Sequence, residues 1–341
     1  MKHSFKSDYC ELAHPKVLKA LSIIGNKQFD GYGLDEFSFR AAELIRNKTK
    51  APEADVHFIG GGTHANLSVI SSALRPFEAV IAPDIGHIFM HEAGAIEATG
   101  HKICSVPDIN GKLLAKDIQN VVDTHADDEH MVFPRLVYIS QSTETGTIYS
   151  KAELTEISNV CKKNGLLLFI DGARLGVAMN SRTNDLSYAD IAELSDVFYI
   201  GGTKNGALFG EAIVIKDETM KKDFRTILKQ RGALHSKGAA IGIQFEALMN
   251  AGLFDELAQH ANAMAAKMAA GIINAGYELM NPVVTNMLFP IFPTKVADTI
   301  RELYGFYDWK KTQDCITVRL VTSWATTESI IDEFIEDLKN I

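Results

Sequence analysis

The sequence predicts an α/β protein built on a doubly wound, mostly parallel sheet, with a smaller α+β domain at its C-terminal end. Short apolar runs alternate with helical segments over roughly 160 residues, which is typical of a parallel sheet covered by helices. Residues 166–170 form an unbroken apolar run, as expected of a strand that is buried on both faces. From residue 277 onward, short strands and helices follow a different pattern, which indicates the second domain.

The N-terminal elements follow from their local signals. The first 14 residues are irregular, and a helix opens at His14-Pro15 because proline suits a first helical turn. Asp35 is placed to cap the next helix. The alternation then predicts strands at residues 56–59, 79–82, 102–106, 136–140, 166–170 and 197–200, and helices at residues 67–74, 90–98, 115–122 and 151–163.

The C-terminal part changes character in two steps. After a strand at residues 212–215, long helices are expected at residues 218–228 and 235–271. The smaller domain then contains strands at residues 287–291 and 315–320 and helices at residues 294–304 and 327–339. We therefore predict a large domain over residues 1–250, with an irregular segment at 1–14, and a small domain over residues 251–341.

Composition and charge argue against several classes of protein. The chain has 341 residues and a net charge of −9, which argues against broad binding to nucleic acid. No stretch approaches the ~20 apolar residues that cross a membrane, and the N-terminus lacks the apolar centre of a signal peptide. The four cysteines are scattered, without a CxxC pair, so reduced thiols and a cytoplasmic location are expected.

A glycine cluster at residues 60–62 lies between a predicted strand and a predicted helix. Free amide groups at such a helix start favour an anion. Gly60, Gly62 and Ala65 also satisfy GxGxxA, and Asp84 ends the next strand, so a dinucleotide site is an alternative. A tight turn without a ligand is a third interpretation. The glycines indicate an anion site but do not identify the anion.

Asp171 and Lys204 favour pyridoxal 5′-phosphate (PLP) as the cofactor. Each follows a buried apolar run, and ligands of open α/β sheets lie beyond the carboxyl ends of the strands. PLP needs an acid that keeps its pyridine nitrogen protonated and a lysine that forms a Schiff base. A nicotinamide enzyme would leave both residues unexplained.

Other side chains are candidates for the same site. Arg174 and Arg319 could bind a substrate carboxylate, although an arginine in the alternating strand at 316–321 could equally point to solvent. His87 could stack on a pyridine ring or lie at the surface. His91-Glu92 lacks the second histidine of HExxH, since residue 95 is alanine, so no metal site is expected.

The motifs together resemble a known family. The chain is similar to the low-specificity L-threonine aldolases of the β-eliminating lyase superfamily, which are fold-type I PLP enzymes. The resemblance spans nearly the whole chain and rests on Phe5-Lys6-Ser7-Asp8, Tyr32-Gly33-Leu34-Asp35, Gly62-Thr63-His64-Ala65-Asn66, His87 to Glu92, Asp171-Gly172-Ala173-Arg174, Thr203-Lys204-Asn205-Gly206 and Val318-Arg319-Leu320-Val321-Thr322.

The resemblance implies a seven-stranded sheet and a role for each matching residue. Lys204 would carry PLP, Asp171 would pair with its ring nitrogen, and His87 would stack on the ring. The cofactor site would also include Gly62, Thr63 and Thr203, and Ser7, Arg174 and Arg319 would fix the carboxylate of the amino acid. Arg231 or Lys237 would reach the phosphate of a neighbouring subunit, because the family forms homodimers, often paired into homotetramers, with sites at the dimer interface.

The implied reaction is cleavage of L-threonine or L-allo-threonine to glycine and an aldehyde. The alternative is another PLP lyase or a racemase, such as a phenylserine aldolase or a β-eliminating lyase. The sequence departs from the family in one loop, where many members carry a histidine near the substrate hydroxyl. Residues 141–146 read Gln-Ser-Thr-Glu-Thr-Gly, so the base could be His87, Glu144 or a phosphate-assisted water.

Overall fold

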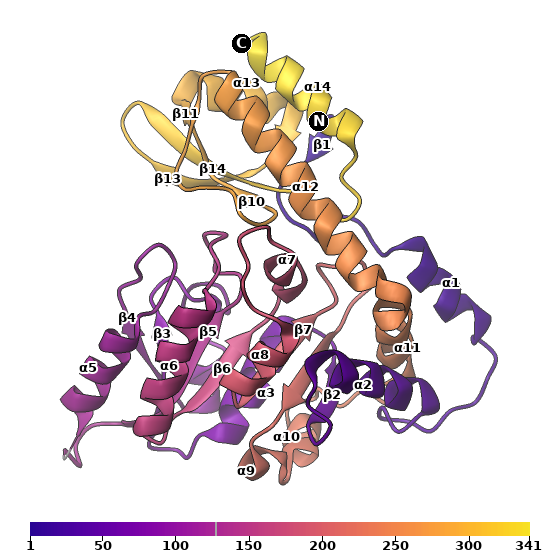
Figure 1. The fold of residues 1–341 in the computed structure, drawn as a ribbon, viewed down its shortest axis with the longest axis vertical. Coiled ribbons are helices and arrows are strands. Elements are labelled where there is room, and N and C mark those ends of the chain that lie inside the picture. The colour runs from indigo at the N-terminus through magenta and orange to yellow at the C-terminus, as the bar shows by residue number, and fades with distance from the viewer. Residues whose placement is uncertain (127) are drawn as a thin grey trace.

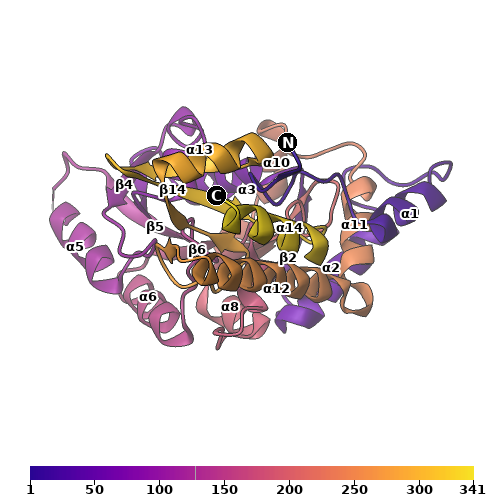
Figure 2. The same ribbon diagram turned by 90° about the horizontal axis from the view of Figure 1, so that it is seen from above.

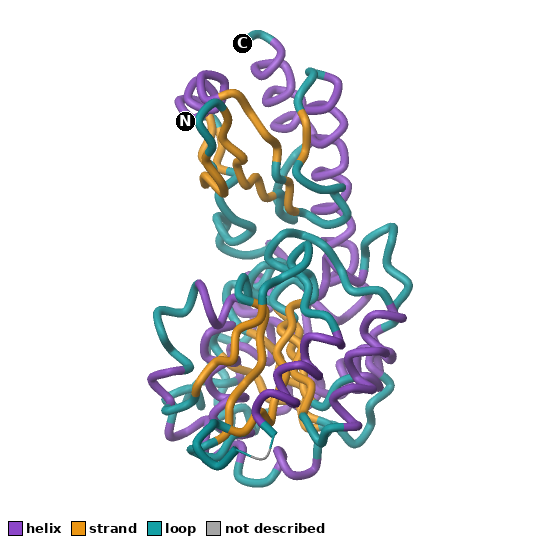
Figure 3. Tube along the Cα trace, turned by 90° about the vertical axis from the view of Figure 1, so that its left-hand side faces the viewer, coloured by secondary structure: helices purple, strands orange, loops and turns teal. Residues whose placement is uncertain are grey.

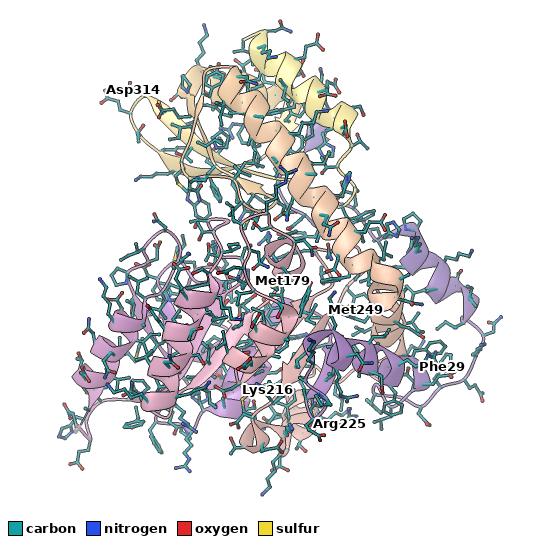
Figure 4. All side chains as sticks on the ribbon, viewed as in Figure 1. Phe29, Met179, Lys216, Arg225, Met249 and Asp314 are labelled. Carbon is teal, nitrogen blue, oxygen red and sulfur yellow. The ribbon has the colours of Figure 1, made fainter. Side chains whose placement is uncertain are left out.

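The computed structural model describes residues 1–126 and 128–341. Figure 1 shows a lower α/β part and an upper part with a small sheet, and the long helix α12 (Leu253–Asn274) runs from one to the other. The predicted division after residue 250 falls just before this helix and stays a prediction. Met249, the last residue of α11 (Ala239–Met249), lies at the foot of α12 in Figure 4, whereas Asp314 lies at the far end of the upper part.

The large sheet has seven strands in the order β2-β8-β7-β6-β5-β3-β4. Five neighbouring strands, from β7 to β4, are parallel, while β8 runs antiparallel to both β7 and β2. The predicted mostly parallel sheet is therefore confirmed. The strands are β2 (Asp55–Ile59), β3 (Glu78–Pro83), β4 (Lys102–Val106), β5 (Phe133–Ser140), β6 (Leu167–Asp171), β7 (Val197–Gly201) and β8 (Glu211–Ile215).

Helices cover both faces of this sheet, as Figure 3 shows. Their starts carry the expected caps: Asp35 accepts two backbone N–H groups of α2, and Ser150 forms a capping box with Glu153 at α6. The helices of this part are α1 (Pro15–Ile23), α2 (Glu36–Thr49), α3 (Gly62–Ala73), α4 (His87–Met90), α5 (Ala115–His125), α6 (Lys151–Lys163), α7 (Leu175–Met179), α8 (Tyr188–Leu194), α9 (Glu218–Lys221) and α10 (Phe224–Gln230), besides α11.

Three predicted helices are interrupted where the backbone becomes left-handed. The helix expected at 90–98 is replaced by the short α4 and a 3₁₀ turn (Glu97–Thr99), with Ala93 and Gly94 at positive φ between them. The helix expected at 218–228 breaks at Asp223 (φ 63°), and the one expected at 235–271 breaks at Ala251 (φ 53°). A residue at positive φ cannot continue a right-handed helix.

The upper part is built on a small antiparallel sheet and three helices. Its main sheet has the order β10-β14-β11-β9, with β13 also paired to β14. Seen from above in Figure 2, α12 and α14 lie side by side. The elements are β9 (Glu278–Leu279), β10 (Met287–Leu288), β11 (Pro290–Pro293), β12 (Tyr304–Gly305), β13 (Tyr307–Lys311) and β14 (Cys315–Val321), with α13 (Thr294–Leu303) and α14 (Glu328–Lys339).

The N-terminal segment belongs spatially with the upper part. A short strand β1 (His3–Ser4) pairs in parallel with β12, and the buried Phe5 packs against Tyr304 and Phe334. This segment was expected to be irregular, and two paired residues are too short to leave a periodic signal. No helix among residues 1–126 and 128–341 is long and apolar enough to cross a membrane.

Candidate active site

A cavity of about 310 Å³ lies beyond the carboxyl ends of the parallel strands β5, β6 and β7. This is where ligands bind in open α/β sheets, and the volume suits a small molecule. Seven of the predicted site residues line it: Gly62, Thr63, His87, Asp171, Arg174, Thr203 and Lys204.

Asp171 is held in place on both carboxylate oxygens. It is buried at the end of β6, where Oδ2 accepts hydrogen bonds from Tyr138 OH (2.6 Å) and Asn66 Nδ2 (3.1 Å). Oδ1 accepts from Tyr199 OH (2.5 Å) and the backbone N–H of Ala173 (3.0 Å). Burial alone would raise the pKa of Asp171, but His87 and these hydrogen bonds outweigh it and lower that pKa. Asp171 is therefore a fixed anion.

Lys204 is a cavity amine without a partner. In the part of the chain that the structure describes, its Nζ has no hydrogen bond and no ion pair, and it lies 6.0 Å from the centre of the Tyr9 ring. Burial, followed by the charge of Arg174, lowers the pKa of the Lys204 amine. A lysine in this state is suited to covalent chemistry, since a neutral amine is the nucleophile.

A buried carboxyl group lies next to Lys204. Glu211, the first residue of β8, accepts hydrogen bonds from Thr203 Oγ1 (2.8 Å) and the backbone N–H of Gly202 (3.0 Å). Burial raises the pKa of Glu211 to about 7. Its two hydrogen bonds fix the loop that carries Lys204.

The glycine turn before α3 presents unpaired amide groups to the cavity. Gly61 caps this 12-residue helix without a side-chain hydrogen bond. Among the described residues, no acceptor faces the backbone N–H of Gly62 or of Thr63. At Gly60, a Cβ would lie 2.7 Å from Nε2 of His235, so a larger residue there would make this imidazole move. The turn has the features of an anion cradle.

The two candidate arginines differ in what they contact. Arg174 donates from Nε (2.7 Å) and Nη2 (3.0 Å) to the buried carboxylate of Asp8. Arg319, on β14, has no ion pair within the described residues: it donates only to Lys6 O (3.3 Å), its Nε is unpartnered, and its guanidinium lies 5.3 Å from the centre of the Tyr307 ring. Arg319 is therefore a cation without an ion pair among the described residues, but it is not among the residues that line the cavity.

His87 belongs to a closed circuit of hydrogen bonds, which we call the acid network. Its Nδ1 lies 2.8 Å from Oε1 of Glu92, which also accepts from Asn66 Nδ2 (2.6 Å), and Asn66 in turn reaches Asp171. On the other side, Ser140 connects Tyr138 to Glu144, which accepts the backbone N–H of His87 (3.0 Å). The acid network consists of Asn66, His87, Glu92, Tyr138, Ser140, Glu144 and Asp171.

The structure does not bring every predicted residue to the cavity wall. Ser7 is buried beside Asp8, with its Oγ 3.3 Å from Sγ of Cys10. Arg231 lies outside the cavity lining, and Lys237 is exposed in a separate hollow with His235. No group of three potential metal ligands occurs in residues 1–126 and 128–341.

Sequence reasoning missed several residues that hold the site together. Asp8 pairs with Arg174 across 166 residues of sequence, which no local pattern could reveal. Tyr138 and Tyr199 had a detectable signal, because a buried tyrosine within an apolar strand needs a partner for its hydroxyl. Glu211 had a similar signal, because it is a buried acid at the start of an apolar strand.

These features fit PLP. The cavity offers one unpartnered lysine amine, one buried carboxylate that stays ionised, and one set of unpaired amides at a helix start. They match the aldehyde, the pyridine nitrogen and the phosphate of the cofactor. Further buried atoms without partners, Ser142 Oγ and Glu144 Oε2, belong to residues of the cavity wall.

Comparisons with known proteins agree with this fit. A family model described as beta-eliminating lyase matches residues 14–293. A low-specificity L-threonine aldolase from a Pseudomonas species is 31% identical over 345 residues, which cover 99% of this chain and 97% of that protein. The structure of Leishmania major threonine aldolase is 48% identical, with a TM-score of 0.97 and 99% of each chain covered.

A more distant solved structure shares the fold alone. Aspartate aminotransferase from Thermus thermophilus is 15% identical, with a TM-score of 0.73 over 100% of this chain and 91% of that one. The architecture is that of the fold-type I PLP enzymes. With its free lysine, fixed aspartate and matching family model, this chain belongs to the beta-eliminating lyase family and is a PLP-dependent lyase.

Proposed function

We propose that this enzyme cleaves L-threonine and L-allo-threonine to glycine and acetaldehyde. The proposal is carried by one observation, the unpartnered Lys204 amine in the same cavity as the fixed carboxylate of Asp171. The names of the similar proteins support the substrate class. The reaction breaks the bond between Cα and Cβ and needs an electron sink at Cα.

Bound PLP supplies an aldehyde that condenses with amines and a ring that accepts electrons from the substrate's Cα. Lys204 would hold it covalently, and Asp171 would keep the proton on its ring nitrogen. The unpaired amides of Gly62 and Thr63, with Thr203 beside them, would bind the phosphate. His87, oriented by Glu92, would lie against the ring.

The substrate carboxylate would be bound by the free guanidinium of Arg319. Arg174 would complete this clamp with the N–H groups that Asp8 leaves free, and Ser7 would support the segment that carries Asp8. Two fixed contacts to the carboxylate would orient the substrate, so that the bond to be broken faces the electron sink.

We further propose that the enzyme works as a homodimer or homotetramer with its sites at the dimer interface. Lys237 is exposed and Arg231 lies outside the chain's own cavity, as expected of groups that reach a neighbouring subunit's phosphate. A cytoplasmic location is proposed from the four free cysteines.

The decisive experiment is product analysis of the PLP-loaded enzyme. L-threonine and L-allo-threonine should each give glycine and acetaldehyde in equal amounts. A 2-oxo acid with ammonia would indicate β-elimination, and the D-amino acid would indicate racemisation. Either product in place of acetaldehyde would overturn the proposal.

A further inference from the structure

Glu144 places a buried carboxyl group in the wall of the cavity. It is in the loop after β5, and its Oε1 accepts hydrogen bonds from Ser140 Oγ (2.7 Å) and the backbone N–H of His87 (3.0 Å). These bonds fix the side chain at the wall of the cavity that contains Lys204. One oxygen of this carboxyl group is therefore fully used in holding its position.

The other oxygen of Glu144 is unused. Oε2 is buried and has no hydrogen-bond partner among the described residues. A buried acceptor without a donor is costly, so native proteins retain one mainly where a ligand or water completes it. The Oε2 atom is thus suited to receive a proton donor from a molecule in the cavity.

Charged and titratable groups face Glu144 from all the elements packed around it. Burial, followed by the negative charge of Asp171, raises the pKa of Glu144, while Ser140 and His87 act in the opposite direction. A raised pKa makes the carboxylate a stronger proton acceptor. The groups whose charges interact with it are His87, Tyr138, Tyr149, Asp171 and Arg174.

We infer that Glu144 Oε2 is the base that takes the β-hydroxyl proton of the substrate. This inference rests on the proposed function and supplies the group that the loop sequence left open. In the step, the O–H bond breaks and its proton moves to Oε2, the O–H electrons form the C=O bond of the aldehyde, and the Cα–Cβ electrons remain on Cα. The proton on Glu144 is afterwards released to water, and Cα takes up one proton to give glycine.

His87 is less suited to this role. Its Nδ1 is engaged by Glu92, and Glu92 is buried with its side chain fully inaccessible. A ring held in this way and stacked on a flat cofactor presents its face, not a nitrogen lone pair, to the bound molecule. The hydrogen bonds of the acid network therefore orient His87, and Glu144 is the residue that transfers the proton.

The test separates the hydroxyl step from the rest of the reaction. Glu144→Gln should lower the rate of threonine cleavage about 10²- to 10⁴-fold, the usual contribution of a positioned base. The same variant should keep glycine binding and the exchange of the glycine α-proton with D₂O within about threefold of wild type, since neither involves a hydroxyl group. The exposed Glu156→Gln is the matched control and should change nothing.

A second readout needs neither cofactor nor turnover. A carboxyl group whose pKa is raised on folding makes the protein less stable as pH rises from about 4.3, the ordinary value, through the raised one. In the apoprotein, Glu144→Gln should remove that part of the pH dependence, so its Tm should rise relative to wild type across this window. Glu156→Gln should follow the wild-type curve.

The outcomes are distinct. Cleavage by Glu144→Gln within about threefold of wild type, or an equal loss of cleavage and glycine exchange, overturns the inference while the proposed function stands. A wild-type enzyme that releases no acetaldehyde overturns both together. If Glu144→Gln does not fold, Glu144→Asp replaces it, and the same split between cleavage and exchange is required.

Discussion

The anionic and the cationic groups of the site differ in how the protein holds them. Both oxygens of Asp171 accept hydrogen bonds, Oδ2 from Asn66 and Tyr138 of the acid network and Oδ1 from Tyr199 and the backbone N–H of Ala173, and Glu92 holds His87. By contrast, Lys204 in the same cavity has no ion pair within the described residues, and neither has Arg319, which lies outside the cavity lining. Asp171, the anion that we assign to the cofactor's ring nitrogen, is thus held by hydrogen bonds in the protein alone, whereas Lys204 and Arg319 have no ion pair in the part of the chain that the structure describes. Preorganised charge of this kind needs no rearrangement during the reaction.

We expect the largest effect when the unpartnered lysine, Lys204, is removed. Lys204→Ala should reduce turnover about 10⁴-fold or more, because we assign to this residue both the attachment and the activation of the cofactor. Borohydride reduction followed by mass spectrometry should label the peptide of residue 204 in wild type and no peptide in the variant. The exposed Lys222→Ala is the control and should be labelled normally at residue 204. A fully active Lys204→Ala enzyme would show that this amine is not the attachment point.

We expect the next largest effect when the buried carboxylate of Asp171 is replaced by a neutral amide. Asp171→Asn keeps the shape but removes the charge, and it should lower kcat about 10²- to 10³-fold, as expected for a preorganised electrostatic group. The amide oxygen can accept either from Tyr199 and Ala173 or from Tyr138 and Asn66, which donate to opposite oxygens of Asp171, so the fold should be kept at a lower stability. Circular dichroism checks the fold while steady-state kinetics give kcat. A rate near that of wild type would remove the ring-nitrogen role from Asp171.

The arginines sharpen the comparison because one is paired and the other is free. Arg174→Leu leaves the buried Asp8 without its cation and should cost about 3–5 kcal/mol of unfolding free energy. Arg319→Leu breaks no ion pair and should change stability by less than about 1 kcal/mol, yet raise KM about 10- to 100-fold through a lost charged contact. Urea unfolding and initial rates separate the two effects. Equal losses of stability would contradict the assignment of Arg319 as the free group.

The smallest effect is on the pH dependence of the apoprotein. Because the pKa of Lys204 is lowered on folding, the unfolded chain binds more protons between that value and the ordinary one of about 10.4. Stability therefore rises with pH across this window. Lys204→Met should make the apoprotein more stable near neutral pH, by a margin that shrinks as pH approaches the upper limit. Thermal unfolding of both proteins, with Lys222→Met as control, measures the difference.

Many of the strands and helices could be predicted because they depend on local sequence patterns. The run at 166–170 indicated β6, and the structure shifts it by one residue, since Asp171 continues the ladder opposite Ser140. The helix expected at 235–271 failed because the reversal at Ala251 depends on tertiary packing, which overrides helical propensity.

Some residues of the site could likewise be predicted from the sequence, and others could not. Asp171 and Lys204 were recognisable because each follows an apolar strand, and both line one cavity. Their partners were not recognisable, since the contact of Asp8 with Arg174 and that of Glu92 with His87 depend on how distant or turned segments meet. The roles of the individual side chains remain predictions until variants are measured.

The lack of a side chain at Gly60 also matters for a segment outside the cavity, the one that carries His235. His235 fills the space that a side chain at residue 60 would need, and His235 stands two residues from the exposed Lys237. A side chain at residue 60 would press on the imidazole of His235, close to the Lys237 that we propose reaches a neighbouring subunit's phosphate. On our assignments, a substitution at residue 60 should therefore act on the phosphate-binding turn and on the proposed subunit contact together.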